Sequence, residues 1–456
     1  MREVIKRRTK LIGEKKRRVA SLRERAARSA RWVGLALAVP LLLAVPTKAQ
    51  GLFSLKGGDR VVFYGDSITD QRLYTTFTET YVVTRFPGLR VWFVHSGVGG
   101  DRVTGGWAGG IDLRLHRDVI AYKPTVMTIM LGMNDGSYKG WDEAVFKTYA
   151  TGYQHIIDTM KQAVPGIRIT VIQPSPYDDV TRPPNIADGY NKVLIRYGQL
   201  VKELGEREGL TVADMNTPVV AMLEKAKTVD PDLAQKIVED RVHPGPGGHL
   251  IMAEALLKAW NAPRLVAAVE IDAAAKTVTH AEQAQVTMLR ANDGLSWTET
   301  DAALPFPLAL DSDDKAFALA VHSSDFVETL DQEPLKVTGL ASARYELKID
   351  GDKVGDFTKQ QLAKGVNLAL LPTPMAKQAA KVHDLTIKHN DIHFARWRDV
   401  QVDLENETAA SSDAPQYEFP SEQAAVGALD RLEEEIVQQQ RAAAQPKTRH
   451  YELSPE

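Results

Sequence analysis

VVFYGDSITD, residues 61–70, changes character in its middle, where bulky apolar residues give way to Gly65, Asp66 and Ser67. A short run of β-branched and aromatic residues that ends in glycine is typical of a buried strand. The small polar residues that follow are typical of the start of a helix. The stretch therefore predicts a strand followed directly by a helix, with Ser67 at the junction.

Three more apolar runs repeat this pattern, namely LRVWFVHSG, PTVMTIMLG and IRITVIQPS. Amphipathic helical patterns separate them, for example at residues 141–164 and 191–208. Strands that are apolar on both faces and alternate with helices form parallel sheets covered on both sides. We therefore predict an α/β domain over residues 50–262, with its ligand site at the carboxyl ends of the strands.

Beyond residue 262 the pattern changes to the period-2 alternation that is typical of antiparallel sheets. The segments are QAQVTML, AFALAVHSSDF, LKVTGL and RYELKIDGDKVGDF. In the last segment, Asp350-Gly351 predicts a hairpin turn, with Tyr345, Leu347 and Ile349 on one face. We predict a mainly antiparallel β domain over residues 263–407.

Residues 408–456 are predicted to form a linker, a helix and a tail. In AAVGALDRLEEEIVQQQRAAA, one face of a helix would carry Val426, Leu429, Leu432 and Ile436. We expect this helix to pack on its own chain or to fray rather than to bind a partner.

Residues 1–49 have the composition of a signal peptide. Thirteen Lys or Arg and three Glu fall within residues 1–31, and the apolar run WVGLALAVPLLLAV precedes small residues that end at Ala49. This run is shorter than the ~20 residues that a spanning helix needs. We therefore expect an exported protein that meets a membrane only if the leader is retained.

The amino-acid composition excludes several classes of function. The 456 residues include no Cys and carry a formal net charge of −3, and because the leader is so basic, the rest of the chain is acidic. We therefore expect no nucleic-acid partner. The lack of cysteine excludes disulfides, thiol catalysis and cysteine zinc sites. No metal-ligand set or phosphate-binding loop is present in the sequence, so we expect no cofactor.

Ser67 has two interpretations at this point. A serine or its preceding aspartate between a strand and a helix is most often an N-cap. A serine acts as a nucleophile only when a base takes its proton and donors stabilise the resulting oxyanion. The junction suits that second role, because it projects the side chain from the sheet and presents the free N–H groups of a helix start. Gly65 would permit the tight turn.

A base for Ser67 is expected from EDRVHPGPGGHLIMAEALLKAW, residues 239–260. Asp240 precedes His243 by three residues in a loop before an amphipathic helix. In a turn, such a pair can bring the carboxylate to one ring nitrogen and leave the other nitrogen for the serine. His249 in the same segment is expected to pack or to cap the helix start.

Oxyanion donors are expected from two other strand ends. Gly100 in SGVGGDR offers a backbone N–H at close range, and Asn134 in LGMNDG offers a neutral side-chain amide. Each residue alone is more simply a turn residue. Together with Ser67 and the Asp240–His243 pair, they place a different catalytic part at each successive strand end.

These residues carry a resemblance to a family. GDSIT at 65–69, Gly100 in HSGVGGD, Gly132-x-Asn134-Asp135 and Asp240-x-x-His243 resemble the four blocks of the SGNH, or GDSL-like, hydrolases in order and spacing. The resemblance covers residues 59–262. Two positions depart from the family pattern: Ile68 replaces a leucine, and His95 stands where an asparagine is common.

The resemblance implies a flavodoxin-like three-layer α/β/α fold and a serine esterase. It implies Ser67 as nucleophile, His243 as base and Asp240 as the residue that orients His243. The N–H groups of Ser67 and Gly100 and the Asn134 side chain would form the oxyanion hole. Supporting positions of the motifs are Asp66, Gly132 and Asp135.

The substrate is less sharply indicated. Trp107, Tyr138 and Trp141, with Asp101 and Arg102, follow the predicted strand ends, and aromatics beside polar groups suit stacking on sugars as well as loop packing. Family members of this size commonly remove acetyl groups from carbohydrates, so we expect a carbohydrate O-acetyl esterase. An O-acyltransferase with the same triad and a non-catalytic carbohydrate-binding protein on the same scaffold are the alternatives.

The segment HNDIHFARWR places His389 and His393 four residues apart, as in some helical metal sites. Its flanks read as strands and supply no third ligand, so we predict a packing or hairpin role. Residues 365–379 are predicted to be a loop-rich segment that packs on the catalytic domain.

Overall fold

The stretch at 61–70 folds as predicted: Arg60–Gly65 form strand β1, and Ser67–Asp70 form the short helix α2. The computed structural model describes residues 52–292, 294–310, 312–402 and 420–456. The leader at 1–49 and the linker at 408–419 lie outside these residues. The described residues belong to one compact unit.

The central sheet is parallel and has the strand order β2-β1-β5-β6-β7. This is the flavodoxin-like order, so the fold prediction is confirmed. Residues Val61 to Tyr64 of β1 are fully buried, because the sheet is covered on both faces. The other strands of this sheet are β2 (Trp92–Gly97), β5 (Val126–Met130), β6 (Arg168–Gln173) and β7 (Thr211–Asp214).

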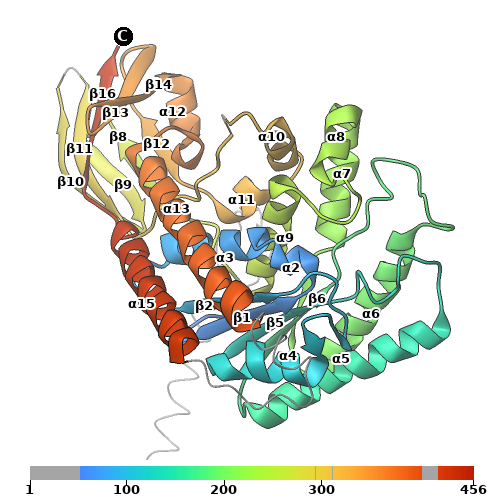
Figure 1. Ribbon diagram of the computed structural model, residues 1–456. Helices are drawn as coiled ribbons and strands as arrows, with labels where there is room; N and C mark the ends of the chain where they lie inside the picture. Colours follow the sequence, from blue (N-terminus) through green and yellow to red (C-terminus); the bar gives the residue numbers. More distant parts are fainter. Residues whose placement is uncertain (1–51, 293, 311, 403–419) are drawn as a thin grey trace, which may run out of the picture. The chain divides into compact units, whose positions relative to one another are not determined.

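Helices α3 and α9 pack together on one face of this sheet, and α4, α5 and α6 lie on the other (Figure 1). The bounds are α3 (Leu73–Arg85), α4 (Ile111–Asp118), α5 (Glu143–Ala163), α6 (Tyr190–Glu208), α7 (Thr217–Val229), α8 (Pro231–Ile237) and α9 (Pro246–Ala259). Residues at the helix ends cap the helices. Asp142 caps α5 by accepting from Ala144 N and Val145 N, and Gly209 ends α6 with a left-handed φ of 65°.

The C-terminal part contains a five-stranded antiparallel sheet, β10-β11-β16-β13-β14, and a four-stranded mixed sheet, β15-β12-β8-β9. Their bounds are β8 (Ala268–Asp272), β9 (Thr277–Glu282), β10 (Ala284–Ala291), β11 (Leu295–Asp301), β12 (Pro334–Thr338), β13 (Arg344–Ile349), β14 (Asp352–Thr358), β15 (Val366–Asn367) and β16 (Arg449–Pro455). A second hydrophobic core includes residues of both sheets. The predicted antiparallel β region is therefore confirmed.

The hairpin at Asp350-Gly351 is also confirmed. Both residues have positive φ, 55° and 85°, as a type I′ turn requires. Tyr345, Leu347 and Ile349 are buried on one face of β13.

The secondary structure predicted for two short segments of this part was wrong. AFALAVHSSDF forms the helices α10 (Lys315–His322) and α11 (Phe326–Leu330), because Asp314 caps α10 and the apolar run fits a helix as well as a strand. The predicted tail contributes β16, which lies between β11 and β13. The alternating pattern of this strand is weak in the sequence, since only Tyr451 and Leu453 are buried in the core.

The predicted strands around His389 were wrong as well. Residues 365–379 form β15, the 3₁₀ turn η2 (Leu368–Leu370) and the start of helix α13 (Pro374–Phe394), which continues as the π-helical segment η3 (Ala395–Val402). Thr373 caps α13 by accepting from Ala376 N at 3.0 Å. The buried face of α13 includes Thr386 and two histidines in place of apolar residues, so hydrophobic periodicity could not reveal it.

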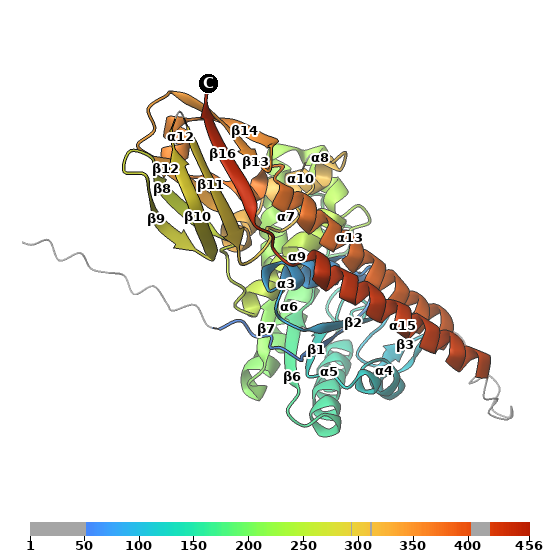
Figure 2. The ribbon, with the colours of Figure 1, turned by 90° about the vertical axis from the view of Figure 1, so that its left-hand side faces the viewer.

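Helix α15 (Pro420–Ala443) packs along α13, and α13 packs on α3 and β2 (Figures 1 and 2). The predicted helix therefore packs on its own chain. Its buried face differs in detail: Ile436 is buried, but Leu432 is 42% exposed and Glu433 and Gln440 are buried instead. Polar residues occupy these positions because they bond to groups on α13 and α3.

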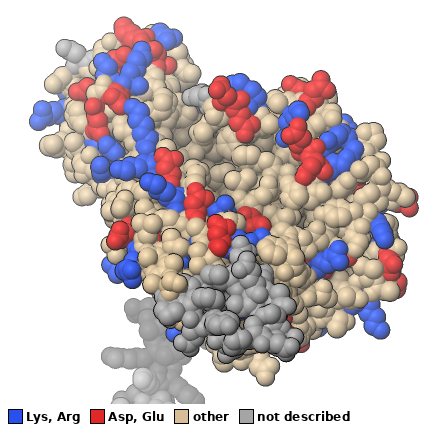
Figure 3. All heavy atoms as spheres, in the orientation of Figure 1, with Lys and Arg blue, Asp and Glu red and all other residues tan. Residues whose placement is uncertain are grey.

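Acidic and basic side chains lie interspersed on the face drawn in Figure 3. On the β13–β14 hairpin, Glu346 pairs with Lys348 at 2.6 Å and with Lys353 at 3.3 Å. Opposite charges on this hairpin therefore neutralise each other locally. Within the part of the chain that the structure describes, no helix has the length and apolar character needed to cross a bilayer.

Candidate active site

The predicted motifs meet at one edge of the central sheet. Ser67 follows the end of β1, Gly100 follows β2 and Asn134 follows β5. Because β1 lies between β2 and β5 and the strands are parallel, the three loops are neighbours at the carboxyl ends of the strands. His243 reaches this edge from the loop before α9.

Ser67, His243 and Asp240 form a hydrogen-bonded chain. Ser67 Oγ lies 2.8 Å from His243 Nε2, and His243 Nδ1 lies 2.6 Å from Asp240 Oδ2. In this geometry a carboxylate holds one ring nitrogen while the other nitrogen can take the serine proton. The structure thus brings the three predicted side chains together in the order that nucleophilic catalysis requires.

A tight turn brings Asp240 to His243. Asp240 Oδ1 accepts the N–H groups of Val242 at 2.9 Å and His243 at 2.7 Å, and Arg241 has a left-handed φ of 72°. Aspartate commonly stabilises turns in this way. Partial burial alone would raise the pKa of Asp240, but the hydrogen bonds from His243 and Val242 outweigh it and lower the pKa. The carboxylate therefore stays ionised beside the ring.

At the strand-to-helix junction, the helix cap and the predicted nucleophile are different residues. Asp66, not Ser67, caps α2, and its Oδ1 accepts from Ile68 N at 3.1 Å. The Ser67 hydroxyl is left for His243. Burial raises the pKa of Asp66 to about 8. Position 65 must be glycine, because a Cβ there would lie 2.7 Å from Met130 O.

Three N–H donors are available at these strand ends. Among the described residues, the backbone amides of Ser67 and Gly100 find no acceptor. Asn134 Nδ2 donates to Asp101 O at 3.1 Å, while Asn134 Oδ1 accepts from Tyr138 OH at 3.0 Å. These two bonds fix the orientation of the amide and use only one of its two hydrogens. The set has the donor types that an oxyanion hole needs.

Gly132 and Asp135 shape the loop that holds Asn134. Gly132 has a φ of +137°, and a Cβ there would lie 2.6 Å from Pro174 Cγ. Asp135 Oδ1 accepts from Val103 N at 2.9 Å, which ties this loop to the Gly100 loop. Burial raises the pKa of Asp135 to about 7. Both residues therefore support the site from beneath.

The three predicted aromatic residues differ in their surroundings. Trp107 is 56% exposed, and its Nε1 donates to Gly99 O at 3.0 Å. Tyr138 is bonded to the Asn134 amide, as described above. Trp141 lies under the Arg196 guanidinium, 4.5 Å from the ring centroid. Trp107 and Tyr138 thus border the catalytic loops directly.

Asp101 and Arg102 also differ. Asp101 is fully buried, and its Oδ2 accepts from Arg114 Nε at 2.8 Å. Arg102 is exposed. Of this pair, only Arg102 is open to a substrate.

His249 packs, as expected. It is buried within α9, where its Nδ1 accepts from Tyr74 N at 3.2 Å and its Nε2 lies 3.0 Å from Gln71 Oε1. Burial lowers the pKa of His249 to about 3, so the ring is neutral. It holds α9 against the start of α3.

His389 and His393 form a separate buried cluster on α13. His389 Nδ1 lies 2.9 Å from Glu79 Oε1, its Nε2 lies 3.0 Å from Glu433 Oε1, and His393 Nδ1 lies 3.4 Å from the same Glu433 oxygen. Burial would lower the pKa of His389, but the two carboxylates raise it to about 10. The packing role is confirmed, although on a helix. The described residues contain no group of three His, Asp or Glu side chains placed to hold a metal ion.

Two residues near the site were missed. Asp70 follows Ser67 by one helical turn, and its Oδ2 accepts from Gly99 N at 3.0 Å. The spacing within GDSITD was the available signal. Arg398 Nη2 lies 3.8 Å from the same oxygen. Nothing in the sequence indicated that contact, because Arg398 belongs to the C-terminal part of the chain.

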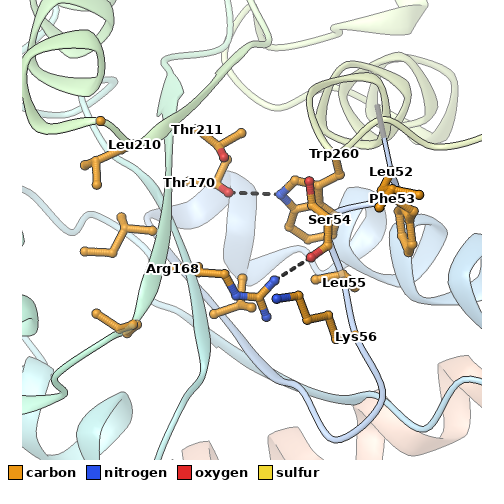
Figure 4. Close-up of a pocket in the computed structure, with 14 residues that line it drawn as sticks. Leu52, Phe53, Ser54, Leu55, Lys56, Arg168, Thr170, Leu210, Thr211 and Trp260 are labelled. Carbon is orange, nitrogen blue, oxygen red and sulfur yellow. Dashed lines mark hydrogen bonds between the residues drawn. The ribbon is translucent and has the colours of Figure 1, made fainter. Parts of the chain in front are cut away.

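A pocket of about 380 Å³ lies at the opposite edge of the sheet (Figure 4). Its lining includes Arg168 and Thr211, the first residues of β6 and β7. Trp260 Nε1 donates to Thr170 Oγ1 at 2.9 Å across it. This pocket is at the amino ends of the strands and does not contain the Ser67 site.

The fold and the site define a three-layer α/β/α hydrolase. Residues 63–251 match the family model of the GDSL-like lipase/acylhydrolases. The match to this family is therefore limited to the α/β/α domain, and the chain is a carboxylic ester hydrolase.

Two similar proteins extend the comparison. An acetylxylan esterase of Geobacillus stearothermophilus is 26% identical over 219 residues, which are 44% of this chain and 93% of that protein. The structure of a gut microbial diltiazem-metabolizing enzyme is 26% identical, with a TM-score of 0.76, and covers 88% of this chain and 98% of that chain. The second overlap is too long for the α/β/α domain alone, so the likeness extends through the C-terminal part.

Proposed function

We propose that this chain is an exported serine esterase that removes acetyl groups from carbohydrates. Ser67 is the nucleophile, His243 is the general base and Asp240 orients His243. The observation that carries the proposal is the chain of hydrogen bonds at 2.8 and 2.6 Å that joins the three side chains.

The mechanism follows from this geometry. Ser67 Oγ attacks the ester carbonyl carbon while His243 Nε2 takes the hydroxyl proton. The tetrahedral intermediate collapses, the C–O bond to the sugar breaks, and His243 returns the proton to the leaving alcohol oxygen. Water, deprotonated by His243, then attacks the acyl-enzyme and releases acetate and free Ser67. Asp240 stabilises the imidazolium formed in each half-reaction.

The oxyanion of both tetrahedral intermediates is bound by the N–H groups of Ser67 and Gly100 and by the Asn134 amide. These donors are held in place before the reaction, so they need little reorganisation when charge develops. One such donor contributes roughly 3 kcal/mol to lowering the barrier.

Two observations support a carbohydrate ester as the substrate. The acetylxylan esterase relative aligns over 93% of its own length with 44% of this chain, which is about the size of the domain that carries this site. The exposed indole of Trp107 is bonded to Gly99, next to the oxyanion donor Gly100, and such an aromatic face suits stacking on a sugar ring.

Export is proposed from the leader alone. Its basic start, short apolar run and small residues up to Ala49 have the pattern of a signal peptide. Fractionation of cells that express the full chain, with mass determination of the mature N-terminus, tests this point. A protein that stays in the cytoplasm with residues 1–49 intact would contradict it.

Acetate release from a panel of acetylated polysaccharides tests the activity, with Ser67→Ala as the inactive variant and Ser342→Ala, in the loop between β12 and β13, as the matched control. We expect acetate release by the wild type and by Ser342→Ala, and none above background by folded Ser67→Ala. A fluorophosphonate probe should label wild-type Ser67.

Failure of the folded wild type to label would favour a non-catalytic binding protein. Acetyl transfer to added sugars in place of acetate release would favour an acyltransferase.

A further inference from the structure

Gly100 lies between two residues that are each held by side chains. On one side, Gly99 N donates to Asp70 Oδ2 at 3.0 Å, and Gly99 O accepts from Trp107 Nε1 at 3.0 Å. Both polar backbone groups of Gly99 are therefore occupied. The peptide that leads into Gly100 cannot rotate without breaking one of these bonds.

Arg398 contacts both side chains that hold Gly99. Its Nη2 lies 3.8 Å from Asp70 Oδ2, and its guanidinium lies over the Trp107 ring at 4.2 Å from the centroid. The Arg398 side chain is only 14% exposed, so these interactions are weakly screened by water. One residue of the C-terminal part therefore links the two contacts on this side of Gly100.

Asp101, on the other side of Gly100, is held through a buried ion-pair network. Asp101 Oδ2 accepts from Arg114 Nε at 2.8 Å, and Arg114 also pairs with Asp118. Trp397 Nε1 donates to Asp118 Oδ1 at 2.7 Å. All of these side chains are buried, so removing one partner leaves polar groups without solvent to compensate them.

Trp397 and Arg398 are adjacent residues of η3, and together they reach both sides of Gly100. The hydrophobic packing agrees with the polar contacts, since Trp397 and Val402 form a small buried cluster with Val98 and Ala108. Val98 lies two residues before Gly100, and Ala108 lies in the turn between the short strands β3 (Gly105–Gly106) and β4 (Gly109–Gly110) that follow the Gly100 loop. A π-helical segment is rare and is frequently found at functional sites.

We infer that Trp397 and Arg398 are positioning residues for the oxyanion hole, through which the C-terminal part of the chain fixes the Gly100 amide. The inference rests on the proposed role of Gly100 in catalysis. Neither residue touches the reacting atoms: Arg398 acts through Asp70 and Trp107, and Trp397 acts through Asp118 and Arg114.

Displacement of a catalytic donor by about 1 Å can cost ~100-fold in rate. We therefore expect Arg398→Ala to lower kcat by about 10- to 100-fold, with a much smaller change in KM. Arg398→Lys keeps a charge near Asp70 but loses the planar stacking on Trp107, so its kcat should lie between those of Arg398→Ala and the wild type.

Arg396→Ala is the matched control. Arg396 also belongs to η3 but bonds to Asp430 at 2.8 Å and to Tyr122 OH at 3.1 Å, away from the Gly100 loop. This variant should retain the kcat of the wild type. An equal fall in kcat for Arg396→Ala and Arg398→Ala would show a general effect of damage to η3 and would overturn the inference.

A second pair of variants tests Trp397. Trp397→Phe and Trp297→Phe each remove a fully buried indole that donates to a carboxylate at 2.7 Å, to Asp118 and to Glu299 respectively. Both should lose thermal stability, but only Trp397→Phe should lower kcat, by about 10-fold or more.

Binding of a trifluoromethyl ketone separates a positioning role from a purely structural one. The adduct of this inhibitor with Ser67 places an oxyanion in the proposed oxyanion hole, so its affinity depends on the position of the Gly100 amide. Affinity for this inhibitor should fall in parallel with kcat in Arg398→Ala and Trp397→Phe. All rates are expressed per folded molecule, checked by thermal unfolding, and Arg398→Lys provides the test if Arg398→Ala does not fold.

The outcomes separate the two proposals. A wild type with no Ser67-dependent activity would refute the proposed function. An active wild type whose folded Arg398 and Trp397 variants keep full kcat and inhibitor affinity would refute only the inference.

Discussion

The molecule contains two imidazole–carboxylate groupings that contrast in almost every respect. His243 bonds to one carboxylate and one hydroxyl, and its side chain is 34% exposed. His389 lies between two carboxylates and is 1% exposed. The first comes from a turn in which Asp240 and His243 are three residues apart, and the second joins α13 to α3 and α15.

The contrast shows what makes a histidine useful for catalysis. A base must gain and lose a proton in each cycle, so one ring nitrogen must face a neutral group that can give up its proton. Glu79 and Glu433 instead stabilise a permanent imidazolium at His389, with a pKa of about 10. His389 is therefore suited to stabilising the fold, whereas His243 is suited to the base role that we propose for it.

The largest expected effect is on turnover at His243. His243→Gln should lower kcat/KM by about 10⁴-fold or more, because among the described residues His243 is the base bonded to the Ser67 hydroxyl. Its free energy of unfolding should change by only about 0.5 kcal/mol, since the ring is partly exposed. Hydrolysis of a chromogenic acetate ester and urea unfolding measure the two quantities. Near-normal turnover would rule out His243 as the base.

Asp240→Asn should have the next largest effect, a loss of roughly 10²- to 10⁴-fold in kcat. The amide can keep the turn by accepting from Val242 N, but an NH₂ group facing Nδ1 would favour the wrong tautomer of His243. Steady-state kinetics with the same ester measures the loss. Labelling by the fluorophosphonate should slow to a similar extent, and unchanged labelling would indicate that Asp240 has no orienting role.

His389→Gln should have the opposite effects to His243→Gln, namely a large loss of folding stability and no loss of turnover. Losing the imidazolium removes the cation that the two buried carboxylates of Glu79 and Glu433 share, which costs about 3–5 kcal/mol of folding stability. The kcat per folded molecule should stay unchanged. His383→Gln on the same helix is the matched control, because it removes a hydrogen bond to Thr80 and a ring stacked on Phe77 rather than an ion pair, and it should cost about 1 kcal/mol. A similar loss in both variants would contradict the ion-pair role.

The last expected effect is a pH dependence of stability. Burial opposes the charged form of His389, but Glu79 and Glu433 raise its pKa from 6.5 to about 10. The stability that His389 provides is therefore fully present below about 6.5 and falls as the pH rises through about 10. Urea unfolding at pH 6.5, 8 and 9.5 should show this decline in the wild type. His389→Gln should lack it, and equal slopes in both proteins would argue against the raised pKa.

The same contrast explains what could be predicted from the sequence. The proposed catalytic side chains stand directly after strands or within a three-residue turn, so motifs and spacing were sufficient to predict that they lie together. The partners of His389 are not local: Glu79 lies 310 residues earlier in the chain. No pattern within α13 records that partner, and for that reason HNDIHFARWR was read as strand.

The contacts of Trp397 and Arg398 were hidden for the same reason. Both are large side chains in a segment without helical hydrophobic periodicity, and their partners Asp118 and Asp70 belong to the α/β/α domain. In contrast, the turn at Asp350-Gly351 was predicted correctly because its positive φ values depend only on residue types at the turn.

The position of β16 has a consequence for the order of events during synthesis. Helix α9 ends at Ala259, so every strand and helix of the parallel sheet has left the ribosome while much of the chain is still untranslated. The segment at 395–402 emerges later, and β16, which lies between β11 and β13, emerges after all other strands. Until then β11 and β13 present open edges to the cell. A nascent chain can thus bring Ser67, Asp240 and His243 together early, but it acquires the contacts of Trp397 and Arg398 later and pairs β11 and β13 with β16 after that.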